Sequence, residues 1–208
     1  GVPVVITKPR GRAAEEVRRL TTNISFVTPK DLNQPNVIIV TSTNPREGKT
    51  TVSVNMAAAF AEKGKSVLLI DADVRHPSVA PALGMNSGVG LVSLLAGEVS
   101  AKEAIQPYWK SYLQVLPAEE QKTPSGIILG SDAMRQLIDQ AAERYDYVIV
   151  DTAPMTVAND AAVFAEKGGV LLLVVGQGVA QKKSLREVVK EFRISKTCLL
   201  YTSPSPRD

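Results

Sequence analysis

The sequence has few of the residues that carry redox, metal and triad chemistry. Cys198 is its only cysteine and His76 its only histidine. A lone cysteine excludes a disulfide framework and a cysteine-based zinc site, and it favours a reducing compartment. A lone histidine argues against His-paired triads and His-rich metal centres. Aromatic residues make up 5% of the chain, and because no basic run is interleaved with them, we expect no nucleic acid partner.

Long apolar runs and a strong net charge are also missing. The unbroken apolar stretch from Val170 to Val175 is far shorter than the roughly 20 residues that cross a bilayer as a helix. The net charge of +3 is compatible with attraction to phosphates or to an anionic membrane surface. With 208 residues, of which 44% are hydrophobic and 22% charged, the chain has the length and composition of one soluble globular domain.

Short apolar strands alternate with helical patterns along the chain. The expected strands are Val37–Val40, Val67–Ile70, Leu113–Leu116, Tyr147–Val150 and Val170–Val175. The expected helices are Arg12–Leu20, Thr50–Lys63, Asp132–Arg144, Asp160–Glu166 and Ser184–Phe192. Strands that are apolar at every position are covered on both faces, which is typical of a parallel sheet between helices. The sequence therefore predicts an α/β fold, a doubly wound parallel sheet flanked by helices.

A loop with glycine and lysine follows the first expected strand. The stretch Thr41–Thr51 contains Gly48, Lys49 and Thr50, which match the GK[ST] end of a P-loop, while Thr43 replaces the leading glycine. Backbone N–H groups of such a loop converge on phosphates together with the N-terminus of the next helix. The lysine reaches the β- and γ-phosphates, and the hydroxyl binds Mg²⁺.

These features predict a P-loop NTPase-like domain that binds ATP and Mg²⁺. The residues expected to contact the nucleotide are Asn44, Pro45, Arg46, Glu47, Gly48, Lys49, Thr50 and Thr51. The alternative is a solvated turn that contains Gly-Lys-Thr by chance, but the strand before it, the helix after it and two acidic strand ends favour the P-loop. Because Arg46 lies where such loops often have glycine, we expect strained or altered geometry there.

Aspartates follow two of the expected strands. Asp71 and Asp73 come after Val67–Ile70, and Asp151 comes after Tyr147–Val150. A carboxylate at the carboxyl end of a parallel strand beside a P-loop holds Mg²⁺ directly or through water. Each aspartate alone could be a helix cap or a turn residue, but three that lead toward one loop indicate a site. Since residues i and i+2 of an extended chain face the same way, Asp71 and Asp73 could both face the γ-phosphate.

The sequence around these motifs resembles the bacterial tyrosine kinases (BY-kinases). Val67–Pro77 is similar to their Walker A′ motif, Thr41–Thr51 to their Walker A, and Tyr147–Pro154 to their Walker B, and the likeness covers roughly Ala13 to Phe192. The resemblance implies a cytoplasmic, ATP-dependent protein-tyrosine autokinase that controls capsule or exopolysaccharide polymerisation and export. It also implies a membrane-anchored co-polymerase segment, in the same chain or on a partner, that would hold the domain at the inner face of the membrane.

The resemblance assigns roles to residues of this chain. It implies that the catalytic residues are Lys49, Asp71, Asp73 and Asp151, and that the metal ligands are Thr50, Asp73 and Asp151. Family members carry Glu-x-x-Arg-x-x-Arg on the leading helix as a ring-forming contact. Glu15 and Arg18 match this pattern and are the expected interface of a ring-type homo-oligomer, whereas Thr21 replaces the second arginine. The family's tyrosine-rich tail is missing, with Tyr201 alone near the end.

The chain divides into three expected parts. Residues 1–35 are an N-terminal segment with a charged helix, residues 36–196 a P-loop kinase or ATPase domain, and residues 197–208 an irregular tail. No strand is expected after the helix that ends near Phe192, so the sheet is predicted to be truncated at its C-terminal end. The tail is either a linker remnant or a non-native junction. Since Gly1 stands in place of Met, we expect a segment excised from a longer protein.

Two other functions are compatible with the same motifs. Partition and division-site ATPases share the fold and the Walker A′ aspartate, but they place a signature lysine where this chain has Asn44. A non-catalytic scaffold that senses ATP and regulates a polysaccharide exporter through assembly is the third possibility. A tyrosine cluster downstream of this segment and membrane helices upstream of it would distinguish the kinase from the ATPase.

Overall fold

A computed structural model of the chain describes residues 2–46, 48–86, 88–122, 125–155, 161, 168–176, 178, 187, 190 and 198–203. The strands within this part are β1 (Val37–Ser42), β2 (Val67–Asp71), β3 (Gln106–Trp109), β4 (Leu113–Leu116), β5 (Tyr147–Asp151), β6 (Val170–Gly176) and β7 (Cys198–Ser203). The helices are α1 (Val4–Thr7), α2 (Arg12–Val27), α3 (Lys49–Glu62), α4 (Val79–Leu83), α5 (Leu91–Leu95), α6 (Ala101–Ala104), α7 (Ser125–Leu129) and α8 (Asp132–Arg144).

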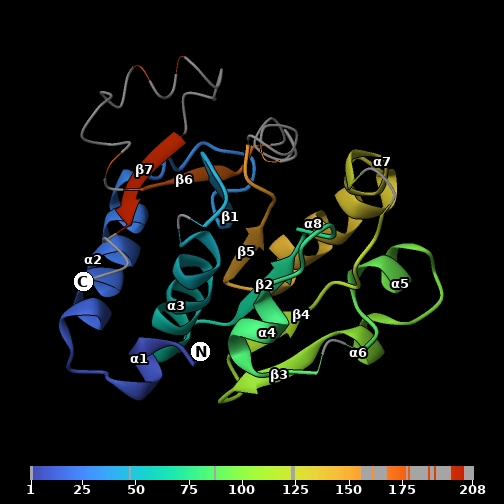
Figure 1. Ribbon diagram of the computed structural model, residues 1–208, viewed down its shortest axis with the longest axis horizontal. Coiled ribbons are helices and arrows are strands. Elements are labelled where there is room, and N and C mark those ends of the chain that lie inside the picture. Colours follow the sequence, from blue (N-terminus) through green and yellow to red (C-terminus); the bar gives the residue numbers. More distant parts are fainter. Residues whose placement is uncertain are drawn as a thin grey trace.

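Seven strands of the described chain form one sheet in the order β3-β4-β2-β5-β1-β6-β7 (Figure 1). Neighbouring strands from β4 to β7 run parallel, and the edge strand β3 runs antiparallel to β4. The predicted doubly wound parallel sheet is confirmed. Strand β3 was not predicted, because its sequence Gln106–Trp109 contains Pro107 and forms no apolar run. Its residues are half-exposed or exposed, as is usual at the edge of a sheet. Proline is tolerated at such a sheet edge.

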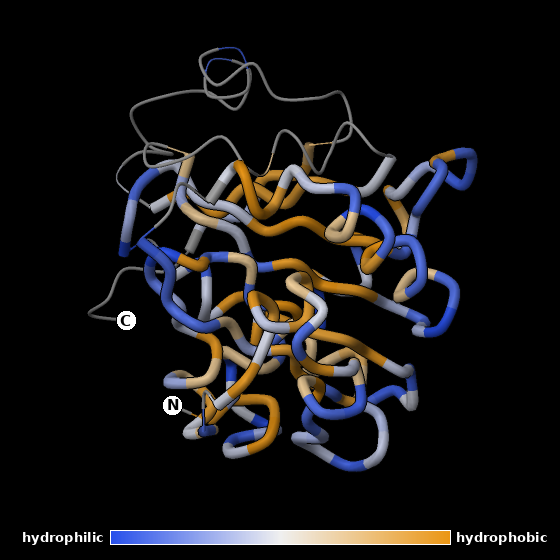
Figure 2. Tube along the Cα trace, turned by 90° about the vertical axis from the view of Figure 1, so that its right-hand side faces the viewer, coloured by the Kyte–Doolittle hydropathy of each residue, from blue (hydrophilic) through white to orange (hydrophobic). Residues whose placement is uncertain are grey.

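Successive residues of the central strands pack on opposite faces of the sheet. In β1, Ile38 and Val40 belong to a core that includes helices α1 to α4, whereas Val37 and Ile39 belong to a second core with helices α5 to α8. Side chains of a strand alternate between two faces, and here both faces are covered, which explains the uniformly apolar strands. Hydrophobic segments run through the interior and hydrophilic ones lie along the outer loops (Figure 2).

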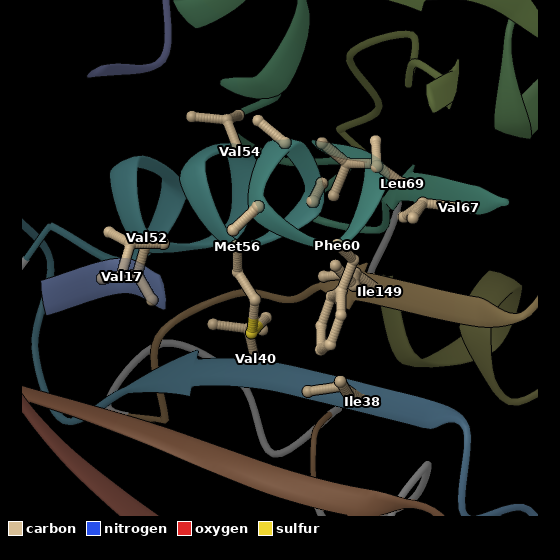
Figure 3. Packing of buried hydrophobic residues seen from close by; sticks show 14 of the residues in the cluster. Val17, Ile38, Val40, Val52, Val54, Met56, Phe60, Val67, Leu69 and Ile149 are labelled. Atoms are coloured by element: carbon tan, nitrogen blue, oxygen red, sulfur yellow. The ribbon is translucent and has the colours of Figure 1, made fainter. Parts of the chain in front are cut away.

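Helix α3 follows the phosphate loop and is buried along most of its length. Its Met56 and Phe60 point toward the sheet, where they pack with Ile38, Val40 and Ile149 (Figure 3). Truncation of a buried aromatic side chain of this kind costs about 3–5 kcal/mol. This packing fixes α3 against β1 and β5, so the side chains of its first turn have a defined place at the carboxyl ends of the strands.

The N-terminal segment packs on α3. Helix α2 was expected at Arg12–Leu20 and continues to Val27. Helix α1 was not predicted, since one helical turn gives little periodicity. It is held in place because Val5 is buried and the Val4 N–H donates to Asn55 Oδ1 of α3 at 2.8 Å. Residues that precede the first strand are therefore part of the same packed unit as the site-bearing helix.

Residues 198–203 correct the prediction for the C-terminal tail. The tail was expected to be irregular, but Cys198–Ser203 forms β7, which pairs in parallel with β6 from Leu171 to Gly176. The prediction that the sheet lacks a strand after Phe192 is therefore wrong. The apolar and β-forming run that starts at Cys198 favours a strand, and the alternation of serine and proline begins only at its end.

Some expectations fall on residues that the structure does not describe. The expected helices Asp160–Glu166 and Ser184–Phe192 lie almost entirely outside the described residues, as do residues 204–208. In the part of the chain that is described, no helix has the length and apolar character needed to cross a bilayer.

Candidate active site

The phosphate loop connects the end of β1 to the start of α3. Arg46 and Gly48 both adopt left-handed backbone conformations, with φ of 67° and 79°. The altered geometry expected at Arg46 is thus present, since this conformation is unfavourable for a residue with a Cβ atom. The Ser42 hydroxyl donates to the Asn44 carbonyl at 2.8 Å, and Asn44, Pro45 and Arg46 are exposed at the tip. Glu47 lies outside the described residues.

Lys49 begins α3, and its side chain reaches two aspartates. Its Nζ lies 3.0 Å from Asp151 Oδ2 and 3.9 Å from Asp73 Oδ2, and its side chain is 7% exposed. The short contact to Asp151 lacks hydrogen-bond geometry, so among the described residues Nζ has no hydrogen-bond partner. Buried polar groups are nearly always hydrogen-bonded. An ammonium group in this state suits an anionic ligand such as a phosphate.

Asp151 connects the end of β5 to the first turns of α3. Its Oδ2 accepts a hydrogen bond from Thr50 Oγ1 at 3.0 Å, and its Oδ1 accepts one from Ser53 Oγ at 2.8 Å. Asp151 is fully buried. Ser53 was not identified from the sequence, although its spacing of three from Thr50 places both hydroxyls on the same side of the helix. The contacts explain why the Walker B carboxylate has a fixed orientation.

Asp71 lies at the end of β2, directly opposite Asp151 in the strand pairing. It is fully buried, and its carboxylate accepts three backbone hydrogen bonds at 3.0 Å, from the N–H groups of Asp73, Ser78 and Val79. Burial, and then the charge of Asp151, raise the pKa of Asp71 to about 7. Its oxygens therefore organise the loop between β2 and α4, which we call the acidic loop. The expectation that Asp71 and Asp73 could both face the γ-phosphate stays a prediction.

Asp73 is the acidic-loop residue that faces the lysine. Its Oδ2 lies 3.9 Å from Lys49 Nζ, and its Oδ1 accepts a hydrogen bond from the His76 backbone N–H at 3.3 Å. Burial raises the pKa of Asp73 above its ordinary value, and the charge of Lys49 acts in the opposite direction. A carboxyl group with a raised pKa beside a phosphate loop is suited to accept a proton from an attacking hydroxyl.

The donor set fits Mg²⁺ that arrives with a nucleotide. Within the described residues, no three carboxylate, imidazole or thiolate groups come close enough to hold a metal ion on their own. Mg²⁺ is usually bound by one or two carboxylates together with phosphate oxygens and water, so such a cluster is not required. Thr50 Oγ1 and Asp151 Oδ2 lie 3.0 Å apart and provide a hydroxyl and a carboxylate at the same place.

Comparison with known proteins identifies the family. The sequence profile described as an AAA domain matches residues 36–192. The tyrosine-protein kinase YwqD of Bacillus subtilis is 33% identical over 197 residues, which cover 95% of this chain and 82% of that protein. The chain belongs to the bacterial tyrosine kinase family. This confirms the resemblance on which the sequence interpretation depends.

Two further relatives of this BY-kinase domain show how it relates to longer proteins. The solved kinase domain of the Escherichia coli tyrosine kinase Etk has a TM-score of 0.83 and 32% identity, with 96% of this chain and 79% of that domain covered. The succinoglycan biosynthesis transport protein ExoP of Rhizobium meliloti is 34% identical over 191 residues, which cover 89% of this chain. Only 24% of ExoP is covered, so the chain corresponds to a part of that protein.

Septum-site and partition ATPases are more distant from this BY-kinase domain. Their solved structures have TM-scores of 0.61 to 0.66 and identities of 18% to 23%, which shows a shared fold. The kinase interpretation is confirmed over the partition ATPase alternative, in agreement with Asn44 at the signature-lysine position.

The residues expected at a ring interface lie on α2, which packs beside α3 on the same face of the sheet (Figure 1). Arg18 is engaged within the chain: its Nε and Nη2 donate to the two Glu62 oxygens at 2.9 and 2.7 Å, and its Nη1 donates to Glu15 at 2.7 Å and to the Pro9 carbonyl at 2.6 Å. The Thr21 hydroxyl donates to the Arg18 carbonyl at 2.8 Å. A ring contact through Glu15 and Arg18 stays a prediction, and it would have to share or replace these contacts.

Proposed function

We propose that this domain transfers the γ-phosphoryl group of Mg-ATP to tyrosine hydroxyls, mostly on neighbouring copies of the same protein. The observation that carries the proposal is the buried Lys49 ammonium group, which lies within 4 Å of two carboxylates and lacks a hydrogen-bond partner among the described residues. A lysine at the end of a phosphate loop binds the β- and γ-phosphates, and phosphate oxygens would supply the missing acceptors.

Thr50 and Asp151 would hold the metal ion, with Asp73 nearby. Bound Mg²⁺ would neutralise charge on the phosphates as the γ-phosphoryl group is transferred. The Thr50 hydroxyl and the Asp151 carboxylate are already in contact, and Ser53 fixes the second Asp151 oxygen. Because these groups are pre-positioned by α3 and β5, little reorganisation is needed, and positioning of this kind supplies much of the rate enhancement in phosphoryl transfer.

Asp73 is our candidate for the group that accepts the tyrosine proton. Its raised pKa makes it a stronger base than an exposed aspartate, and its Oδ2 faces the lysine at the site. Asp71 contributes indirectly, since its three backbone hydrogen bonds shape the loop that carries Asp73. Hydrolysis of ATP would follow when water replaces the tyrosine hydroxyl.

The cellular role that we propose is regulation of capsule or exopolysaccharide polymerisation and export. It is supported by the relatedness to ExoP, whose name connects it with succinoglycan biosynthesis and transport. We propose that a membrane-anchored co-polymerase segment, in the same chain or on a partner, holds the domain at the cytoplasmic face of the membrane. Self-association into a ring through α2 would place the acceptor tyrosines of one copy near the site of another.

The proposal is tested by replacing Lys49 with methionine, which keeps an unbranched side chain up to the ε position and removes the charged amino group. Phosphotyrosine formation on an added tyrosine-containing acceptor is expected to fall by about 100-fold or more, because the charge acts on the transferring phosphoryl group. The measurement is incorporation of radiolabelled phosphate from ATP, with circular dichroism as a check of folding. Lys65→Met, which removes an exposed lysine beyond the end of α3, is the matched control.

Equal labelling of Lys49→Met and the unchanged protein would contradict the assignment of the site. A loss of labelling in Lys65→Met as large as in Lys49→Met would show that charge alone, and not the position of Lys49, accounts for the effect.

A further inference from the structure

Ser78 is a hydroxyl residue at the site to which no motif assigns a role. It lies five positions after Asp73, directly before helix α4. Its Oγ is 2.6 Å from Thr50 Oγ1, and its backbone N–H donates to Asp71 Oδ2 at 3.0 Å. Ser78 therefore contacts the first turn of α3 through its side chain and the acidic strand end through its backbone.

The hydroxyl of Ser78 is not used to cap its own helix. Serine at the position before a helix usually accepts a hydrogen bond from a backbone N–H two or three residues later. In the described structure, Ser78 forms no such side-chain cap of α4. Its hydroxyl is directed to Thr50 instead, so the contact is not explained by the requirements of α4.

The direction of the Ser78–Thr50 hydrogen bond follows from the single hydrogen that each hydroxyl group carries. A threonine hydroxyl has one hydrogen and two lone pairs. The Thr50 hydrogen is donated to Asp151 Oδ2 at 3.0 Å, because a carboxylate can only accept. Ser78 must then be the donor to Thr50 Oγ1 in the 2.6 Å contact. This arrangement uses one lone pair of Thr50 and leaves the other for a cation.

We infer that Ser78 is a positioning residue for the Mg²⁺ site, because it donates to Thr50 and so orients the hydroxyl that binds the metal. The same residue couples the acidic loop to the phosphate loop, since its backbone is bound to Asp71. The inference deepens the proposed function and rests on it, because it requires Thr50 to be a metal ligand. It predicts that loss of the Ser78 hydroxyl weakens Mg²⁺ binding and so raises the Mg²⁺ concentration that nucleotide binding requires.

The variants separate the hydroxyl from the rest of the residue. Ser78→Ala removes the donor to Thr50 and keeps the backbone N–H that Asp71 accepts. Ser78→Thr restores a hydroxyl at the same position. Ser66→Ala is the matched control, because Ser66 is also half-buried and its hydroxyl donates to Asp146 Oδ2 at 3.2 Å, at the opposite end of β2.

The experiment measures binding of a fluorescent ATP analogue to the whole chain at increasing MgCl₂ concentration. Binding of the analogue is measured again in EDTA, without free metal. Thermal unfolding of each variant without nucleotide checks that the variant is folded. In Ser78→Ala the half-saturating Mg²⁺ concentration is expected to rise by about fivefold to tenfold, as for one lost hydrogen bond. Binding in EDTA is expected to be unchanged. Ser78→Thr and Ser66→Ala should give the Mg²⁺ dependence of the unchanged protein.

Two results would overturn the inference while the proposed function stands. One is a Ser78→Ala titration that superimposes on that of the unchanged protein. The other is an equal loss of binding with Mg²⁺ and with EDTA, which would show a merely structural role. If the unchanged protein bound the analogue equally well with and without Mg²⁺, the proposed function would be contradicted. The role of Ser78, which requires a metal ion at Thr50, would then be contradicted as well.

Discussion

At the residue scale, the site depends on side chains that are buried and charged at once. Each of Lys49, Asp71, Asp73 and Asp151 is at most 6% exposed as a whole residue, in a domain whose charged residues lie mostly at the surface. Burial of charged groups is costly unless they are paired. Here the Lys49 ammonium group lies within 4 Å of the Asp73 and Asp151 carboxylates, while Asp71 accepts backbone hydrogen bonds. A site with more carboxylates than cationic side chains favours binding of a divalent cation.

Arg46 gives a prediction at the same scale. A left-handed conformation costs a residue with a Cβ atom about 1–2 kcal/mol, and Arg46 has φ of 67°. Arg46→Gly removes this strain but adds backbone freedom to the unfolded chain, so a net gain of about 0.5–1 kcal/mol in unfolding free energy is expected. Chemical denaturation of the nucleotide-free domain measures it.

Lys110→Gly is the control for Arg46→Gly, since Lys110 has φ of 52° in the turn between β3 and β4, away from the site. Both variants should gain stability, and only Arg46→Gly should change nucleotide affinity. A loss of stability in Arg46→Gly would show that the arginine side chain makes contacts that outweigh the strain.

At the element scale, α2 is joined to α3 by one bidentate ion pair. The side chains of Arg18 and Glu62 are 22% and 30% exposed, and the contact lowers the pKa of Glu62. Bidentate arginine–carboxylate pairs are stronger than ordinary surface pairs because two parallel hydrogen bonds fix the geometry. Helix α2 therefore has a defined position on the helix that carries Lys49 and Thr50.

Replacement of Arg18 by methionine tests this connection. The unfolding free energy is expected to fall by about 1–2 kcal/mol, since a partly buried carboxylate loses charged hydrogen bonds. Glu15→Gln should cost less than about 0.5 kcal/mol, because Glu15 is largely exposed. Size-exclusion chromatography with light scattering of the same variants tests the ring contact: loss of assembly without loss of stability in Arg18→Met would contradict the intrachain role.

At the scale of the whole molecule, the buried carboxylates make folding stability depend on pH. The pKa of Asp71 is about 7 in the folded chain against an ordinary value of 3.8, and that of Asp73 is also raised. Between these values the folded state binds more protons than the unfolded state, so stability decreases as pH rises. Glu62 acts in the opposite direction, but only below its ordinary value of 4.5.

The nucleotide-free domain should therefore unfold at a higher temperature near pH 5.5 than near pH 8, as measured by differential scanning calorimetry. Asp71→Asn cannot titrate, so its melting temperature should change less across this range, whatever its absolute stability. A melting temperature that rises from pH 5.5 to pH 8 in the unchanged protein would contradict the raised pKa of these carboxylates.

The sequence by itself determined the class of fold and predicted which residues form the candidate site. Strands such as Val37–Val40 are apolar at every position, and this local pattern is enough to predict a covered parallel sheet. The Gly48-Lys49-Thr50 match and the aspartates at two strand ends likewise need only short-range spacing. These signals are local because they reflect the periodicity of one strand or the geometry of one loop.

Tertiary structure alone decided which groups meet. Nothing in the sequence indicates that Ser78 contacts Thr50, that Asp71 is turned to the backbone of its own loop, or that Arg18 binds Glu62. The strands β3 and β7 were missed for a related reason, since a strand at a sheet edge is defined by its neighbour as much as by its own residues. Contacts between residues far apart in the chain depend on how packed helices and strands place them, and no local pattern encodes that placement.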